Sequence, residues 1–426
     1  MLSSSRKHVA FFLLVAGAAS ARAEAPITLD ELQSLARIHS PKLKSARAAV
    51  SSADADVRAA GALRGPRVDI GVFGRAATPF NVSVANGTVP LQLPLSGGAN
   101  AMLTQPISDL YALTQNHAAA EHLRDATSLR AQAAENDLAA TVAALYFRHA
   151  AAAAQVDHAR AEVAAAQARR DVAASLATQG QGDMAAVLDA KLAVATSEAQ
   201  TATAEAALDD GRAEIEALIG ISFPAGRALS TTLEKPQLLS VPEKAEETAA
   251  QARFDVQAAE ADAAAAERRC SAAAQDLYPQ LAISAEAGPV VDAIHPPLWA
   301  AATANVRWTA LDWGLSRARE DAACARAAQA RQAALDTASE ARTAVRQAMR
   351  ADQTAQRRVD AQERALALAT ELSRVVADKA ARGSATKAEA LTAQARVADA
   401  NAQLAAATAE WLTARVRIEL ALARQR

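Results

Sequence analysis

The residue patterns that most resemble catalytic or metal sites fail on spacing or context. His117, Glu121 and His122 suggest a zinc-binding helix, but the two histidines are five residues apart, about 140° around a helix. Neither H-E-x-x-H nor H-x-x-E-H is present there. Gly180-Gln181-Gly182 resembles a dinucleotide loop, yet it follows a predicted helix and not a strand. No Walker loop occurs, so the sequence predicts no enzyme, no cofactor and no metal.

The composition favours long, thin helices over a globular core. The 426 residues are 51% hydrophobic, 22% charged and only 3% aromatic, and alanine is the commonest residue. Alanine is the strongest helix former and lets helix backbones approach closely. No run of about 18 apolar residues is present, which excludes a membrane protein built from several spanning helices.

The first residues predict export. The basic residues Arg6 and Lys7 precede an apolar stretch over residues 9–19, and residues 21–23 read Ala-Arg-Ala, a pattern typical of signal peptidase sites. We therefore predict a signal peptide over residues 1–23. The formal net charge is −2, and losing the basic leader makes the chain more acidic, which argues against a nucleic-acid partner.

Proline placement divides the chain. All 14 prolines lie in residues 26–106, 224–242 and 279–297. Because proline breaks helices, the two proline-free blocks predict uninterrupted helix, and glycines at 180, 182 and 383 predict the turns of two helical hairpins. The long arms, about residues 110–178 and 312–381, would each extend roughly 100 Å.

The two blocks are copies of each other. At an offset of 203, Gly180 matches Gly383 and Ile215 matches Ile418, while an offset of 213 matches Pro66 with Pro279. The predicted organisation is a first repeat over 24–220 (strand pair about 66–108, helical hairpin 109–220), a linker over 221–247, and a second repeat over 248–426 (strand pair about 279–311, helical hairpin 312–424).

Each repeat contains one candidate strand pair. Residues 66–72 and 281–285 alternate apolar and polar side chains, and so do their expected partners, about residues 99–108 and 302–311. The joining loops, 77–98 and 289–300, are rich in Gly, Pro, Asn and Ser. Such alternation fits strands with one side in lipid, and the side chains expected to face lipid are Val68, Ile70, Val306 and Trp308. A small soluble β-hairpin is the alternative.

The strand count constrains the assembly. Membrane barrels start at about eight strands, and an open sheet edge in lipid leaves backbone groups unpaired. If four strands enter a membrane, several chains must share one barrel, and the long helices continue below it as a tube.

These features resemble the TolC family of outer-membrane efflux proteins. The resemblance is carried by Ile27–Leu32, Ser40–Leu43, Leu103–Asp109, its copy Val306–Gly314, and Gly383–Gln394. It implies a mainly α-helical fold with a small membrane β-barrel part, and a homotrimer with a 12-stranded barrel in the outer membrane and a helical tunnel in the periplasm. It also implies docking to a periplasmic adaptor and an inner-membrane pump.

The predicted function is therefore a passive exit duct for tripartite efflux or type I secretion. The alternative is an exported coiled-coil scaffold or adaptor without a pore. An adaptor normally carries one helical hairpin between β-rich domains, whereas this chain carries two hairpins and duplicated strand pairs. The sequence does not indicate the substrate.

Two sets of residues near the helix turns are candidate sites. Docking to the adaptor is assigned to Gly180, Gly182, Asp183 and Met184 at one turn and Gly383, Ser384 and Thr386 at the other, although ordinary helix capping explains these residues equally well. A resting gate is assigned to Asp171, Arg374, Asp378 and Arg382. The favoured alternative for these four is a solvated helix face with an internal i,i+4 ion pair.

The two cysteines, Cys270 and Cys324, lie on predicted helices that flank the same strand pair. Both should sit roughly 13–18 Å below the barrel, in a compartment that permits disulfides. A disulfide and two separate buried thiols both remain open, and the separate thiols are the favoured interpretation.

Overall fold

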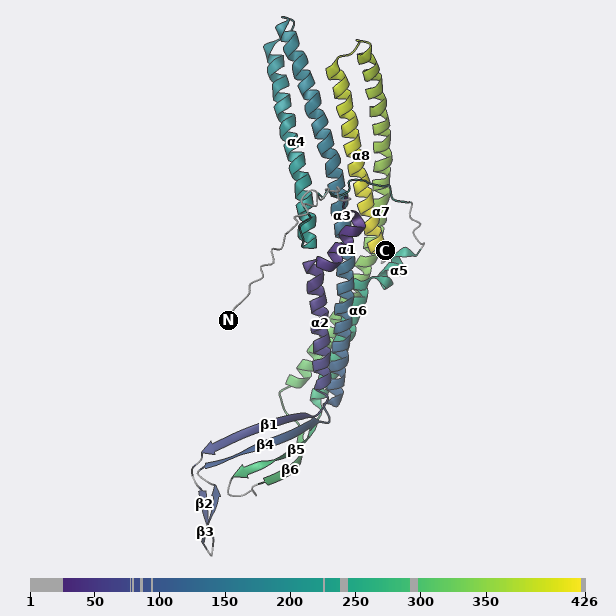
Figure 1. Ribbon diagram of the computed structural model, residues 1–426. Helices are drawn as coiled ribbons and strands as arrows, with labels where there is room; N and C mark the ends of the chain where they lie inside the picture. The colour runs from purple at the N-terminus through teal and green to yellow at the C-terminus, as the bar shows by residue number, and fades with distance from the viewer. Residues whose placement is uncertain are drawn as a thin grey trace, which may run out of the picture.

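The computed structural model describes residues 26–76, 78, 80–84, 87–92, 95–224, 227–237, 244–291 and 298–422. The predicted signal peptide lies outside these residues. The chain is elongated, with the turns of two helical hairpins at one end and β-strands at the other (Figure 1).

Two helices run almost the full length of the helical part. They are α3 (Leu110–Thr178) and α7 (Leu315–Ala381), with 69 and 67 residues. Five buried alanines of α7 recur every seven residues, from Ala327 to Ala355, which is the spacing of coiled-coil seams. The shorter helices α4 (Met184–Ile219) and α8 (Lys387–Ala421) return from the turns.

The start of α7 lies three residues later than predicted, because Asp312 organises the preceding turn. The Asp312 carboxylate accepts hydrogen bonds from the backbone N–H groups of Gly314, at 2.9 Å, and Ser316, at 2.8 Å. A hydrogen bond from the Ser316 side chain, together with these backbone hydrogen bonds, holds the pKa of Asp312 below its usual value. Gly314 has a φ of 87°, a backbone conformation that favours glycine.

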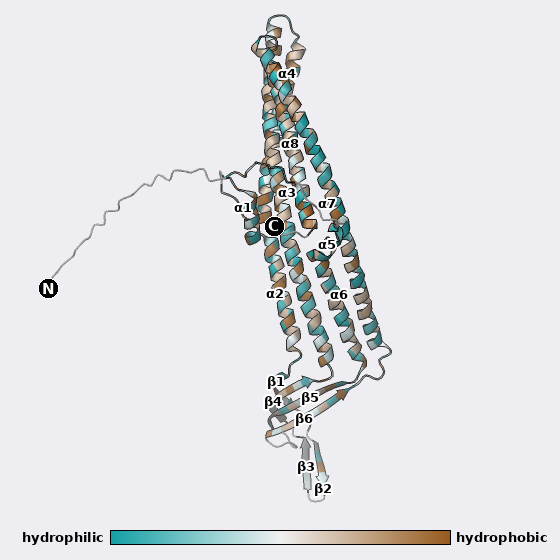
Figure 2. Cartoon of the chain, turned by 90° about the vertical axis from the view of Figure 1, so that its right-hand side faces the viewer, coloured by the Kyte–Doolittle hydropathy of each residue, from teal (hydrophilic) through white to brown (hydrophobic). Residues whose placement is uncertain are grey.

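The remaining helices are α1 (Leu29–His39), α2 (Pro41–Ala62), α5 (Ala245–Ala252) and α6 (Phe254–Ala273), followed by a 3-10 turn at Ala274–Leu277. Of these, α2 and α6 complete a wall one helix thick. Helices α8 and α6 each pack between α3 and α7 at different heights. The wall therefore reads α4–α3–α8–α7 toward the turns (Figure 1) and α2–α3–α6–α7 toward the strands (Figure 2).

A belt of short segments covers one face of this wall at mid-height. We define the belt as α1, residues 227–237 and α5. Ile27 pairs with Leu229 in a parallel bridge, and Leu32 of α1 joins a core with Leu138 and Ile215. An ion pair between Arg227 and Glu31, at 2.7 Å, joins two segments of the belt. Most of the large buried side chains of the first repeat lie beneath it.

Four antiparallel strands form one sheet in the order β1-β4-β5-β6. The strands are β1 (Arg67–Ala76), β4 (Leu95–Pro106), β5 (Gln280–Val291) and β6 (Leu298–Arg307). The region expected to be a single loop over 77–98 contains a second hairpin, β2 (Phe80–Val84) with β3 (Gly87–Gln92). Four of its residues are β-branched, namely Val82, Val84, Thr88 and Val89, which favours strand.

The last strand also differs from the prediction. β6 ends at Arg307, which pairs with Gln280, and the expected strand residues 308–311 lie beyond it. The residue opposite Trp308 would be Pro279, but β5 begins only at Gln280, so Trp308 has no strand residue to pair with. Trp308 is therefore exposed in the connection to α7 and not part of the sheet.

Candidate functional sites in the sheet, the helix turns and the wall

The sheet has one apolar and one polar face. Hydrogen-bonded pairing aligns Val68 with Leu103, Leu103 with Ala285, and Ala285 with Ala302, so apolar side chains share one face. Ile70 and Val306 lie on the same face and are 82% and 69% exposed. A sheet with a large exposed apolar face is suited to contact with lipid.

Polar groups meet on the opposite face. The Asn100 amide donates a hydrogen bond to Glu286 across β4 and β5, and Arg67 pairs with Asp69 at 2.7 Å. Position 288, next to these groups, requires glycine, because a Cβ there would lie 2.0 Å from the Ala99 carbonyl oxygen. The sequence analysis identified neither the Asn100–Glu286 contact nor Gly288, since both depend on strands that are distant in sequence.

The predicted tip residues lie at the two turns farthest from the sheet. Gly180 and Gly383 have φ angles of 71° and 75°, which favour glycine at a helix end. Asp183 caps α4 by accepting from the Ala185 N–H at 3.2 Å. Thr386 forms a reciprocal capping box with Glu389, whose backbone N–H donates to the threonine hydroxyl at 3.1 Å. Capping is thus one role of these residues.

Gly182 has a packing role that the sequence did not indicate. A Cβ at Gly182 would lie 3.0 Å from the Ala177 backbone nitrogen and 3.1 Å from the Leu176 carbonyl carbon. Any larger residue at Gly182 therefore requires the backbone at positions 176 and 177 to move by a few tenths of an ångström. At Gly180 and Gly383 the space is open, and only the backbone angle favours glycine.

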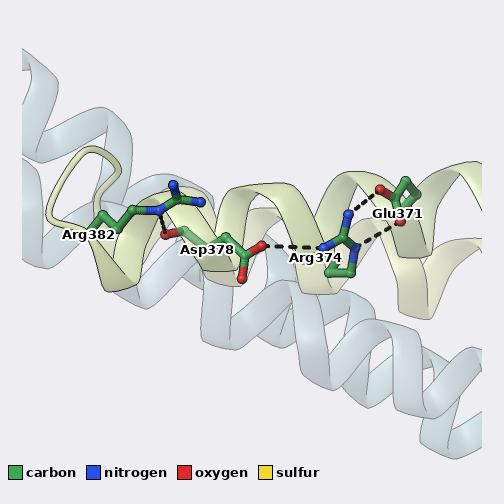
Figure 3. A network of polar contacts seen from close by, with 4 residues as sticks. All are labelled: Glu371, Arg374, Asp378 and Arg382. Carbon is green, nitrogen blue, oxygen red and sulfur yellow. Dashed lines mark hydrogen bonds and ion pairs between the residues drawn. The ribbon is translucent and has the colours of Figure 1, made fainter.

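The four predicted gate residues do not meet across helices within this chain. Arg374 pairs with Asp378 at 3.4 Å and, more closely, with Glu371 at 2.7 Å, all on α7 (Figure 3). Arg382 donates to the Asp378 carbonyl at 3.2 Å. Within one chain, the contacts are those of a solvated helix face with internal pairs.

Two more charged groups lie near the turns, Asp171 on α3 and Glu371 on α7. Asp171 pairs with its neighbour Arg170 at 2.6 Å. Glu371, which the sequence analysis missed, receives two hydrogen bonds from Arg374. These bonds and the guanidinium charge hold the pKa of Glu371 below its usual value, so this pair stays ionised until the pH falls below that lowered pKa.

A buried polar cluster ties α7 to α8. Asp352 accepts from the Trp411 indole N–H at 2.9 Å and pairs with Arg415 at 3.1 Å. The Arg415 side chain is only 4% exposed, and its guanidinium also lies 5.9 Å from the centre of the Trp411 ring. The sequence offered no signal for this cluster, because the partners are about 60 positions apart.

The cysteines correct the favoured prediction. Cys270 of α6 and Cys324 of α7 form a disulfide, with their Cα atoms 4.7 Å apart. The residues matched to them in the first repeat, at offsets of 213 and 203, are Val57 and Glu121. The favoured prediction of two separate buried thiols was wrong, because spacing along two helices does not reveal which faces of those helices meet.

The disulfide can be tested by the reactivity of the two cysteines before and after reduction. Because both sulfur atoms are bonded, the mature protein purified from its native compartment is expected to contain no thiol that reacts with maleimide before reduction. Two reactive thiols are expected after reduction. Intact-mass spectrometry of maleimide-treated protein checks this, with Cys270→Ser as the control that leaves one reactive thiol at Cys324. Two modified thiols without reduction would contradict the assignment.

The suspected metal motif does not assemble. The His117 ring lies 3.7 Å from the Glu121 carboxylate on the same helix. Within the described ranges, no group of three or more His, Cys, Asp or Glu side chains is placed to hold a metal ion. None of the helices in the described part of the chain combines the length and apolar character needed to span a bilayer.

Comparison with known proteins identifies the architecture. The family described as "Outer membrane efflux protein" matches residues 32–221 and 246–424. The chain belongs to this family. Its membership confirms the predicted TolC-like fold class, mainly helical with a small membrane β-barrel part. It also confirms the role as an outer-membrane exit duct in efflux that extends into the periplasm, and selects the duct over the scaffold without a pore.

Solved structures of this family share the fold at low sequence identity. The chain is 18% identical to CusC, with a TM-score of 0.76, covering 92% of this chain and 91% of that one. CmeC of Campylobacter jejuni is 14% identical, with a TM-score of 0.79 and coverage of 92% and 85%. VceC of Vibrio cholerae is 19% identical, with a TM-score of 0.73 and coverage of 92% and 95%. No curated protein sequence matches the chain.

Proposed function

We propose that three copies of this efflux protein assemble into one duct with a 12-stranded barrel. The supporting observation is the sheet: it has four strands, two outer strands β1 and β6 that each have only one partner, and an exposed apolar face. Unpaired strand edges are not tolerated in lipid. Pairing β1 of one copy with β6 of the next removes every edge when the ring closes. Val68, Ile70 and Val306 then face lipid, with Trp308 just below the last strand.

The edges of the helical wall support the same closure. Helices α4 and α7 are its outermost members toward the turns, and each exposes an apolar stripe: Leu188 and Leu192 on α4, and Leu368, Leu372 and Val375 on α7. Both stripes lie within about 20 Å of the turns. We assign them to contact between neighbouring copies, which would turn three walls into one tube.

Cross-linking tests the assembly. In Leu192→Cys/Leu372→Cys protein, a short bismaleimide should convert monomers into covalent trimers in outer-membrane fractions, because each wall edge meets the opposite edge of a neighbour. Leu192→Cys alone and Leu372→Cys alone are the controls and should yield no trimer. Extraction of the protein without detergent, or cross-linking only to dimers, would contradict a trimeric membrane duct.

We further propose that the turns dock a periplasmic adaptor that connects the duct to an inner-membrane pump. The supporting observations are that the turns lie farthest from the sheet and are rigidly capped. Gly180, Gly182, Asp183 and Met184 form one tip, and Gly383, Ser384 and Thr386 form the other. The duct itself would be passive, so the pump would supply the energy and most of the substrate selection.

The first tip provides a clean test of docking. Gln181→Trp adds bulk at an exposed position without the backbone collision expected at Gly182. We expect this variant to lose most efflux, measured as drug accumulation in cells, while trimer abundance stays unchanged. Gln181→Ala is the matched control and should transport normally. Wild-type efflux by the tryptophan variant would contradict docking at this turn, and its residues would then only cap the helices.

The gate residues make a smaller prediction. Asp171, Arg374, Asp378 and Arg382 are proposed to bias the periplasmic end toward closure through contacts between neighbouring copies. Each exposed pair contributes only about 0.2–1 kcal/mol, but threefold repetition multiplies the bias. Arg374→Ala/Asp378→Ala should raise single-channel conductance in planar bilayers. Arg169→Ala, which removes a nearby charge that pairs with Glu162 and with none of the four gate residues, is the control. Unchanged conductance of an assembled double variant would leave these residues as surface charges.

A further inference from the structure

The helical wall has one face that the belt leaves uncovered. Toward the turns, α8 lies between α3 and α7. On one side of α8, Leu404 and Thr408 line a cavity that residues 231–235 of the belt close, and α5 packs on α7 and the end of α8. The opposite side carries a cavity of about 750 Å³ that only α3, α7 and α8 line.

Four arginines surround this second cavity. We define the arginine groove as the space bordered by Arg148 of α3, Arg350 and Arg358 of α7, and Arg417 of α8. Its floor consists largely of alanine, including the buried Ala355, Ala409 and Ala414. The groove therefore combines an apolar base with guanidinium groups at its rim.

Only two of the four guanidinium groups have carboxylate partners. Arg358 pairs with Glu410, which also lines the groove, and Arg148 pairs with Glu214 of α4. Arg350 and Arg417 form no ion pair with any described residue. The groove thus has four guanidinium groups and only two carboxylate partners. Both unpartnered guanidinium groups belong to α7 and α8.

The antiparallel packing of α7 and α8 places those two arginines opposite each other. Asp352 of α7 pairs with Arg415 of α8. Arg350 is two residues before Asp352, and Arg417 is two residues after Arg415, so they lie level across the same seam. A step of two residues turns about 200° around a helix. Because Asp352 and Arg415 lie on the belted face, Arg350 and Arg417 lie on the uncovered face. Like charges held level in this way favour a bound anion.

We propose that the arginine groove binds organic anions that combine an apolar ring system with a carboxylate, and that it does so on the inner wall of the duct. The location rests on the trimeric duct proposed above: when the wall closes into a tube, the belt encircles the outside and the uncovered face lines the lumen. Arg350 and Arg417 bind the carboxylate, since guanidinium groups match its planar oxygens. The alanine floor receives the apolar body. Three grooves then form a positively charged ring halfway along the tunnel.

Calorimetry with 2-naphthoate tests the binding site on the full chain in a neutral detergent. Arg350→Gln/Arg417→Gln should weaken 2-naphthoate binding by about tenfold or more, because both charge-assisted contacts are lost. The matched control is Lys235→Gln/Arg346→Gln, which removes the same charge from residues that pair with Glu363 and Glu246 at the belt. That control should bind like the wild type, and the cation 2-naphthylmethylammonium should not bind.

The outcomes separate the groove from the duct. Absence of 2-naphthoate binding to the wild type, or equal affinity in the Arg350→Gln/Arg417→Gln variant, overturns the proposal, provided that circular dichroism shows the same helix content. In planar bilayers, 2-naphthoate should reduce the current of the wild type and leave that of the variant unchanged. If 2-naphthoate blocks the wild-type current and the variant current equally, the groove lies outside the lumen. If the protein binds 2-naphthoate specifically but forms no channel, the proposed duct is contradicted and the arginine groove is not.

Discussion

Ile70→Arg is expected to remove most of the assembled protein from the outer membrane, whereas Asp69→Arg at the adjacent position should be tolerated. Ile70 is on the apolar face of β1 and is 82% exposed, so the proposed barrel turns it toward lipid. Arginine on the lipid face of a barrel costs about 2–4 kcal/mol near the bilayer centre. Position 69 is on the polar face, where an added guanidinium stays in water.

Depth in the membrane should modulate this effect. Val306 is the second-last residue of β6 and lies near the helical end of the sheet, so Val306→Arg should be milder than Ile70→Arg, because the cost falls to about 0–1 kcal/mol near the interface. Asn305→Arg is its polar-face control. Quantitative blotting of cross-linked trimer in outer-membrane fractions measures all four variants. Equal trimer levels for Ile70→Arg and Asp69→Arg would refute the assignment of the faces.

Local signals were enough to predict the long helices and the strand faces. The absence of proline over residues 107–223 and 298–426 left only glycines to end the helices, and the turns do contain Gly180 and Gly383 at positive φ. Alternation alone placed Val68 and Ile70 on one face, because side chains in a strand alternate with a period of two. These properties depend on neighbours within a few residues.

The errors involved contacts between distant segments. The Cys270–Cys324 disulfide depends on the relative rotation of α6 and α7, which helix periodicity does not fix. The end of β6 depends on where its partner strand begins, at Gln280, and the restriction at Gly182 depends on how the turn folds back onto Leu176. The arginine groove needs three helices from two repeats, so none of its arginines was distinguishable in the sequence from a solvated charge.

The buried cluster between α7 and α8 carries the largest expected effect on stability. Asp352→Ala leaves the Arg415 guanidinium, already 4% exposed, without its carboxylate partner, and also removes the acceptor of the Trp411 indole. Two further Arg415 nitrogens, Nε and Nη1, have no hydrogen-bond partner within the described structure, so the side chain depends on Asp352. Removing one member of a buried ion pair typically costs about 3–5 kcal/mol.

A double variant separates the loss of the pair from the burial of an unpaired charge. Asp352→Ala/Arg415→Met should be more stable than Asp352→Ala alone, since methionine leaves no charge among the buried residues and can fill the space. Thermal unfolding of the detergent-solubilised protein, followed by circular dichroism, gives the ranking. Arg358→Gln provides the control, because it breaks an exposed pair between the same helices and should shift stability by at most about 1 kcal/mol. If Asp352→Ala unfolds at the wild-type temperature, Asp352 does not anchor α7 to α8. A lower unfolding temperature that Arg415→Met does not raise would instead attribute the loss to the indole hydrogen bond of Trp411.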